Sequence, residues 1–145
     1  MKTYLMTMLC IVAMVILATA STADIPIPTN LTVLFQKGGK PYRRPVDFKV
    51  RCYGWSGLPG KSRPEPYTPQ EVYSFSGSCP DYGCRIRHNF HLNYKHIDYC
   101  DLEGVSEGKP FKVEKFGNNP AGTCSEGKPG AGLLQNCELS ITLTK

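Results

Sequence analysis

The chain has 145 residues, of which 17 are Lys or Arg and 12 are Asp or Glu, so its formal net charge is +5. That mild positive excess favours solubility and weak attraction to anionic surfaces, and it is not by itself the signature of a nucleic-acid-binding protein. The length suits one ordinary domain and excludes two.

Residues 1–23 have the pattern of a secretory signal peptide. Lys2 precedes an apolar run from Leu5 to Leu17, and small residues follow as far as Ala23. The run is shorter than the ~20 residues that a membrane-spanning helix needs. We therefore expect cleavage after Ala23, or after Ala20 as the second choice, with secretion to the extracellular space and no membrane span afterwards.

Removal of the first 23 of the 145 residues leaves 122, which we expect to form a single domain, 24–145. This part keeps six cysteines, an even number that predicts three disulfides in an oxidising compartment. Structural zinc is disfavoured because no Cys-x-x-Cys pair occurs. The spacing favours Cys79–Cys84, and elimination together with core-facing parity then suggests Cys100–Cys124 and Cys52–Cys137.

The mature region shows no sustained helical repeat, and its apolar residues instead alternate with polar ones. Together with the Gly- and Pro-rich segments between them, this pattern indicates roughly seven short strands. The segment QKGGKPYRRP reads as a turn, and the Pro-rich segment 55–69 reads as an ordered surface loop. The alternation is clearest at 31–35, 46–52, 71–76, 84–95, 111–116 and 137–143.

The segment around Cys79 and Cys84 has the form of a hairpin closed by a four-residue loop. Antiparallel pairing would place Phe75 opposite His88 and Tyr73 opposite Phe90. The second strand then has an apolar face and a polar face, and a bulge near His96 would restore its alternation further on. The polar face would carry Arg85, Arg87, Asn89, His91, Asn93 and Lys95.

These features predict an all-β fold, a small disulfide-stabilised antiparallel β-sandwich of immunoglobulin-like or prealbumin-like type. A small closed β-barrel is the alternative. A fold of this kind does not by itself indicate a function, so function has to be inferred from particular side chains.

The basic side of the predicted hairpin is the main candidate for a binding site. Alternate residues on a strand stand ~6.6 Å apart, so Arg85, Arg87, His91 and Lys95 would form a ladder. Arg51, with Lys49, would widen it from a neighbouring strand. We expect this ladder to bind an acidic or sulfated glycan, or an extracellular protein. Nucleic acid is disfavoured for an exported chain whose strand lacks base-stacking aromatic residues.

Two other functions are alternatives. A small ribonuclease-like hydrolase would use His91 and Glu71 as acid and base, with Arg85, Arg87 and Lys95 stabilising phosphate charge. A protease inhibitor would present the 55–69 loop as rigid bait. The favoured hypothesis is a binding domain with no catalytic residue.

No metal site or cofactor is expected. His88 and His91 would point to opposite sides of a strand, so they would not share a metal ion. The other candidate metal ligands in this region are His96, Asp98 and Asp101.

Asn30-Leu31-Thr32 is a sequon for N-glycosylation, and it predicts a glycan on Asn30 in a host that has the enzyme.

Overall fold

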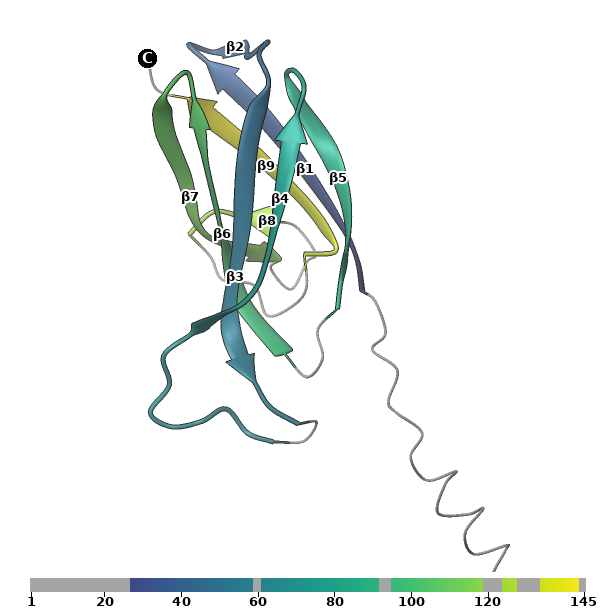
Figure 1. Cartoon of the computed structure of the whole chain (residues 1–145), viewed down its shortest axis with the longest axis vertical. Helices are drawn as coiled ribbons and strands as arrows, with labels where there is room; N and C mark the ends of the chain where they lie inside the picture. The colour runs from purple at the N-terminus through teal and green to yellow at the C-terminus, as the bar shows by residue number, and fades with distance from the viewer. Residues whose placement is uncertain (1–26, 59–60, 92–94, 119–123, 128–133, 144–145) are drawn as a thin grey trace, which may run out of the picture.

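The computed structural model describes residues 27–58, 61–91, 95–118, 124–127 and 134–143. The regular structure of these ranges is β-strand throughout, arranged in two sheets (Figure 1). Within them no helix is long and apolar enough to span a membrane. The expected signal peptide, 1–23, lies outside the described residues.

Sheet A is centred on β1, which has a strand on each side. β1 pairs with β5 and with the short β2 in antiparallel fashion, and with β9 in parallel fashion. The strands are β1 (Ile27–Lys37), β2 (Lys40–Pro41), β5 (Gly83–Phe90) and β9 (Asn136–Leu143).

Sheet B has the strand order β4-β3-β6-β7-β8. Its pairs are all antiparallel, and the register between β3 and β6 shifts after Tyr53, so Asp98 is the extra residue of a bulge. A bulge was expected near His96, two residues away. The strands are β3 (Val46–Ser56), β4 (Gln70–Cys79), β6 (Lys95–Ser106), β7 (Lys109–Asn118) and β8 (Cys124–Ser125).

The core lies between the two sheets. Every second residue of β1, β3 and β9 is buried, and these apolar side chains belong to a single cluster that both sheets share. The strands predicted at 31–35, 46–52, 71–76, 111–116 and 137–143 are therefore confirmed, because burial on one face of a sheet demands a period of two. The strand predicted at 84–95 is shorter, since β5 ends at Phe90. The largest members with almost no exposed area are Phe35, Phe90, Phe116, Leu31, Leu102 and Leu134.

The predicted hairpin between β4 and β5 is wrong. β4 pairs with β3 in sheet B, whereas β5 pairs with β1 in sheet A. The link between them hydrogen-bonds to other segments: Phe35 N–H donates to the Tyr82 carbonyl at 2.8 Å, and Tyr82 N–H donates to the Tyr42 carbonyl at 2.8 Å. Phe75 and His88 still touch, with ring centres 4.2 Å apart, but they stack from one sheet to the other.

One of the three predicted disulfides is confirmed and two are wrong. Cys79–Cys84 joins β4 to β5 and so links the two sheets. The other bridges are Cys52–Cys100 and Cys124–Cys137, in place of Cys100–Cys124 and Cys52–Cys137. Cys52 lies directly opposite Cys100 on the neighbouring strands β3 and β6, which brings their Cα atoms within 4.0 Å.

The parallel pairing of β1 with β9 differs from the fully antiparallel sandwich that was expected. Both strands run from the same end of sheet A, where Asn30 lies opposite Asn136. β9 begins beside β8, to which the Cys124–Cys137 bridge ties it. The chain therefore enters sheet A at the end where β1 also starts.

The closed β-barrel, which was the alternative expectation, differs from the observed structure. β4 and β5 do not pair, and the described strands form two separate sheets.

Candidate functional site

Arg85 and Arg87 lie side by side on the outer side of sheet A. β5 alternates as predicted, with Ile86 and His88 turned toward the interior and both arginines exposed. Within the described residues neither arginine takes part in an ion pair. We call this surface the arginine face.

Uncharged polar residues of β1 lie next to the two arginines. Arg85 is the register partner of Thr32, and Arg87 is the partner of Asn30. One strand further, β9 places Glu138 beside Thr32 and Asn136 beside Asn30, whose Nδ2 donates to Asn136 Oδ1 at 3.2 Å. The arginines therefore have amide and hydroxyl groups as their nearest neighbours across the sheet, and a carboxylate only two strands away.

The predicted ladder is shorter than the sequence suggested. His91 follows the last residue of β5 and is exposed. Lys95 opens β6 in sheet B, where its Nζ lies 6.0 Å from the ring centre of Tyr73. Lys95 therefore does not continue the line of Arg85 and Arg87, because the chain leaves sheet A after Phe90. Asn93, which was expected on the same polar face, lies outside the described residues.

Arg51 lies on the outer side of sheet B rather than beside the arginine face. Its Nε is 2.7 Å from Glu103 Oε1, and its NH1 is 3.0 Å from Glu71 Oε2. The hydrogen bond that Arg51 donates to Glu103, followed by the one that it donates to Glu71, raises the pKa of Arg51. Its charge is thus engaged within sheet B. Lys49 is also on this sheet, so neither residue widens the arginine face.

The residues proposed for hydrolysis are not brought together. Glu71 belongs to β4 in sheet B, and its hydrogen bond with Arg51 lowers the pKa of its carboxyl group. Arg85 and Arg87 project from the outer side of sheet A, and His91 lies at the end of β5. An acid and a base must both reach one substrate, and this distribution over two sheets does not assemble that geometry.

The histidines considered for a metal site occupy separate environments. His88 lies between the sheets, with its Nε2 2.9 Å from Tyr73 Oη, and burial, followed by the charge of His91, lowers its pKa. His96 stacks on Trp55 at 4.1 Å, on the outer side of sheet B. Among the described residues no group of three His, Cys, Asp or Glu side chains is placed to hold a metal ion.

The Pro-rich loop, proposed as inhibitor bait, is fastened to β6. Tyr67 Oη donates a hydrogen bond to Asp98, and Arg63 NH2 lies 3.4 Å from the same carboxylate. The guanidinium of Arg63 also lies 4.5 Å from the Tyr67 ring centre. Burial, together with the hydrogen bond to Asp98, raises the pKa of Tyr67 to about 12. This end of the loop packs against sheet B.

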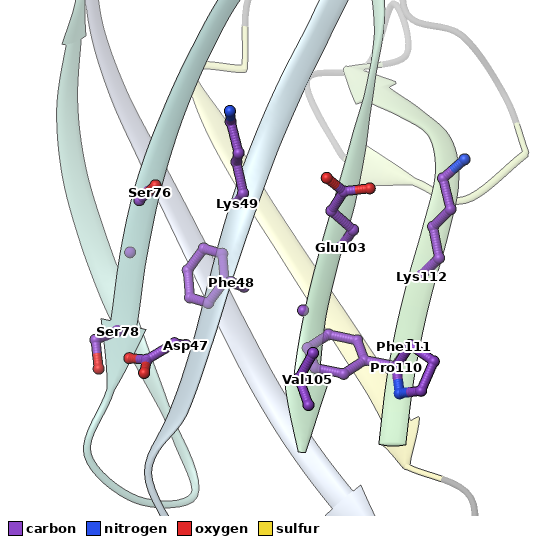
Figure 2. A pocket seen from close by; sticks show the side chains of 12 residues that line it. Asp47, Phe48, Lys49, Ser76, Ser78, Glu103, Val105, Pro110, Phe111 and Lys112 are labelled. Atoms are coloured by element: carbon purple, nitrogen blue, oxygen red, sulfur yellow. The ribbon is translucent and has the colours of Figure 1, made fainter. Parts of the chain in front are cut away.

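Sheet B carries a broad hollow that sequence reasoning missed (Figure 2). Its volume is about 1070 Å³, and four strands contribute to it. Its charged groups are of both signs, and Lys112 is already 2.9 Å from Glu114 and 3.2 Å from Asp101. The small residues around Gly77 and Gly104 were the available signal. The lining comprises Asp47, Phe48, Lys49, Ser76, Gly77, Ser78, Glu103, Gly104, Val105, Pro110, Phe111 and Lys112.

A second group of cations gathers at the end of the molecule that holds the β1–β2 turn, and we call it the basic end. Glu107 lies among these cations. It accepts a hydrogen bond from Lys37, and its Oε1 lies 2.8 Å from Arg44 NH1. The Lys37 hydrogen bond is the main cause that lowers the pKa of Glu107. The basic residues in these turns are Lys37, Lys40, Arg43, Arg44 and Lys109.

Comparison with models of known protein families, with curated proteins and with solved structures finds no match for this chain. Three surfaces of the described part of the chain are candidates for a binding site: the arginine face, the hollow of sheet B and the basic end. In the basic end, Glu107 neutralises part of the charge, and in the sheet B hollow both signs are mixed. The arginine face differs from both because the residues directly beside its cations on β1 are uncharged, and the carboxylate of Glu138 lies one strand further away.

Proposed function

We propose that this chain is an extracellular, non-catalytic binding domain that holds an anionic glycan, acidic or sulfated, on the arginine face. The observation that carries the proposal is the exposure of Arg85 and Arg87 without an ion-pair partner among the described residues. A guanidinium group presents a planar fork of N–H donors that matches carboxylate and sulfate oxygens. Two such forks on alternate positions of one strand stand ~6.6 Å apart.

The surroundings of the arginines suit a sugar chain. Asn30, Thr32 and Asn89 are polar residues on the same side of sheet A. Their amide and hydroxyl groups can donate to and accept from sugar hydroxyls. The arginines then supply affinity for the anionic groups, while the uncharged residues contact the rest of the sugar.

An extracellular location fits the rest of the chain. The three disulfides are typical of an oxidising compartment, and the signal-peptide pattern at 1–23 points to export. We infer that the two sheets form a sandwich of immunoglobulin-like or prealbumin-like type. Such a scaffold offers flat, rigid outer sides, and one of them would serve as the binding surface.

The test uses chain exported to a bacterial periplasm, where disulfides form and no N-glycan of this kind is added. Affinity for heparin, a sulfated glycan, is measured by calorimetry at two salt concentrations. Counterion release at two contacts predicts about tenfold weaker binding at fourfold higher salt. The double variant Arg85→Ser/Arg87→Ser should lose most of this affinity and most of its dependence on salt.

The matched control is Arg43→Ser/Arg44→Ser, which removes the same charge from the basic end. We expect it to keep most of the heparin affinity, because Arg44 is already paired with Glu107. Equal losses in both double variants would mean that net charge alone drives binding. Full retention by Arg85→Ser/Arg87→Ser would remove the arginine face from consideration.

A further inference from the structure

Two features that look unrelated in the sequence occupy one place in the fold. The sequon residues Asn30 and Thr32 belong to β1, and the two arginines belong to β5. The register pairs Asn30 with Arg87 and Thr32 with Arg85. Directly opposed residues in an antiparallel pair have Cα atoms ~4.5–5.5 Å apart. The sequon is therefore the immediate neighbour of the arginine pair.

The side chains also point to the same side of sheet A. Leu31, between the two sequon residues, is 0% exposed in the core, so Asn30 and Thr32 point outward. Arg85 and Arg87 are exposed on that outer side as well. β1 is flanked by β5 and β9 at ~4.8 Å on either side, so a bulky group on Asn30 would spread over both neighbours.

The hydrogen bond of Asn30 is compatible with modification. The side-chain amide carries two N–H donors, and Nδ2 donates to Asn136 Oδ1 at 3.2 Å. One donor is enough for that contact, and the other can be replaced by a bond to sugar. Glycosylation therefore does not require the Asn30–Asn136 contact to break.

We propose that an N-linked glycan on Asn30 covers Arg85 and Arg87 and so closes the arginine face to anionic ligands. In the transfer, Nδ2 of Asn30 forms a bond to C1 of an oligosaccharide that is joined to a lipid diphosphate. The C1–O bond to the diphosphate breaks, the amide loses one proton, and the lipid diphosphate leaves. Transfer precedes folding, because β1 is hydrogen-bonded to strands on both sides in the folded chain.

This inference rests on the proposed function and concerns its regulation. Chain made without the glycan would bind anionic glycans, whereas glycosylated chain would not. The ratio of the two forms, set during secretion, would decide how much of the protein is able to bind.

The experiment compares three chains secreted from a eukaryotic cell line: the natural chain, Thr32→Ala, which destroys the sequon, and Thr32→Ser, which keeps it. The natural chain and Thr32→Ser should carry a glycan and pass through a heparin column at physiological salt. Periplasmic Thr32→Ala, which carries no glycan, measures separately what the loss of the Thr32 hydroxyl does to heparin retention. Secreted Thr32→Ala should be retained to the same extent as periplasmic Thr32→Ala.

A second readout does not depend on heparin binding. Modification of single arginines by phenylglyoxal, followed by mass spectrometry, should be several-fold slower at Arg85 and Arg87 in glycosylated chain than in Thr32→Ala. The rate at Arg43, in the basic end, should be the same in both. Shielding confined to Arg85 and Arg87 would support the inference even if heparin proves to be the wrong ligand.

Three results would overturn the inference: secretion with Asn30 unmodified, equal heparin retention of glycosylated chain and Thr32→Ala, or equal phenylglyoxal rates at the arginine pair. Failure of the proposed function looks different. In that case the unglycosylated chain itself would show no salt-sensitive binding, whatever the phenylglyoxal rates are.

Discussion

His88 illustrates how a single residue couples the two sheets. It projects from β5 in sheet A, stacks on Phe75 at 4.2 Å, and lies within hydrogen-bonding distance of Tyr73, both on β4 in sheet B. Burial is the first cause that lowers its pKa, and the nearby His91 is the second. The contact was expected from the sequence as a cross-strand pair, and it exists instead as a contact between sheets.

The lowered pKa of His88 predicts that acid destabilises the fold. The unfolded chain, with an ordinary pKa of about 6.5, takes up the proton before the folded chain does. The contribution of His88 is therefore complete above pH ~6.5 and declines as the pH falls from there toward the lower pKa of the folded state. Guanidinium unfolding near pH 7.5 and pH 5.5, the range in which histidine titrates, should show this loss.

The variant His88→Phe should lose less stability than the natural chain over the same pH interval, because phenylalanine keeps the stacking and cannot be protonated. His96→Phe is the matched control, since His96 also stacks on an aromatic ring but lies on the outer side of sheet B. A pH dependence in His88→Phe as steep as that of the natural chain would show that the titration of His88 contributes nothing to acid sensitivity.

At the level of elements, the link between β4 and β5 decides the topology. Gly83 adopts a φ of 141°, and a Cβ atom at this position would lie 2.1 Å from the backbone oxygen of Val33. Only glycine allows the chain to pass so close to β1 as it crosses from sheet B to sheet A. The sequence PDYG is typical of a hairpin loop, but here its glycine allows the chain to pass from sheet B to sheet A.

Gly83→Ala should therefore cost on the order of 3 kcal/mol of unfolding free energy, from backbone strain and overpacking together. Gly39→Ala is the control: Gly39 also has a positive φ, of 74°, but nothing lies within 4 Å of an added Cβ. Its cost should be roughly 1–2 kcal/mol. Chemical denaturation of both variants measures the difference, and equal costs would mean that the close approach to Val33 is relieved by a small shift.

At the level of the whole molecule, the bridges differ in what they constrain. Cys52–Cys100 joins two residues of sheet B that are 48 positions apart in the chain. Cys79–Cys84 joins residues only 5 positions apart, and it links the two sheets. The entropy lost by the unfolded chain grows with the length of the closed loop. The longer loop is therefore expected to make the larger contribution to stability.

Replacement of both cysteines by alanine should cost about 4 kcal/mol for the 52/100 pair and about 2 kcal/mol for the 79/84 pair. Guanidinium unfolding of the two double variants gives both values under the same conditions. The reverse order would mean that linking the sheets matters more than shortening the unfolded chain. Peptide mapping of the unreduced natural chain checks the connectivity first.

The binding surface also belongs to the whole molecule, since it depends on which strands are neighbours. The arginine face brings together Arg85 and Arg87 with Asn30, which is 55 or more positions away in the chain. Lys95 and Arg51 were expected to extend this surface, but both belong to strands of sheet B. Strand pairing therefore shortened the site and at the same time placed a sequon within it.

The sequence by itself determined which residues of the strands face the core. Alternation showed which residues of β1, β3, β5 and β9 face the core, because a strand buried on one side has a period of two whatever its neighbours are. It showed in the same way that Arg85 and Arg87 point outward. The disulfide Cys79–Cys84 was also predictable, because four intervening residues leave the two cysteines close together.

Only the tertiary structure decided which strands are adjacent. Backbone hydrogen bonds are the same for every residue, so alternation does not distinguish β3 from β5 as the partner of β4. That choice determined the Cys52–Cys100 bridge, the parallel pairing of β9, and the separation of Arg51 and Lys95 from the arginine face. It also set Asn30 beside Arg87, because side-by-side packing of β1 and β5 buries their apolar residues in the shared core.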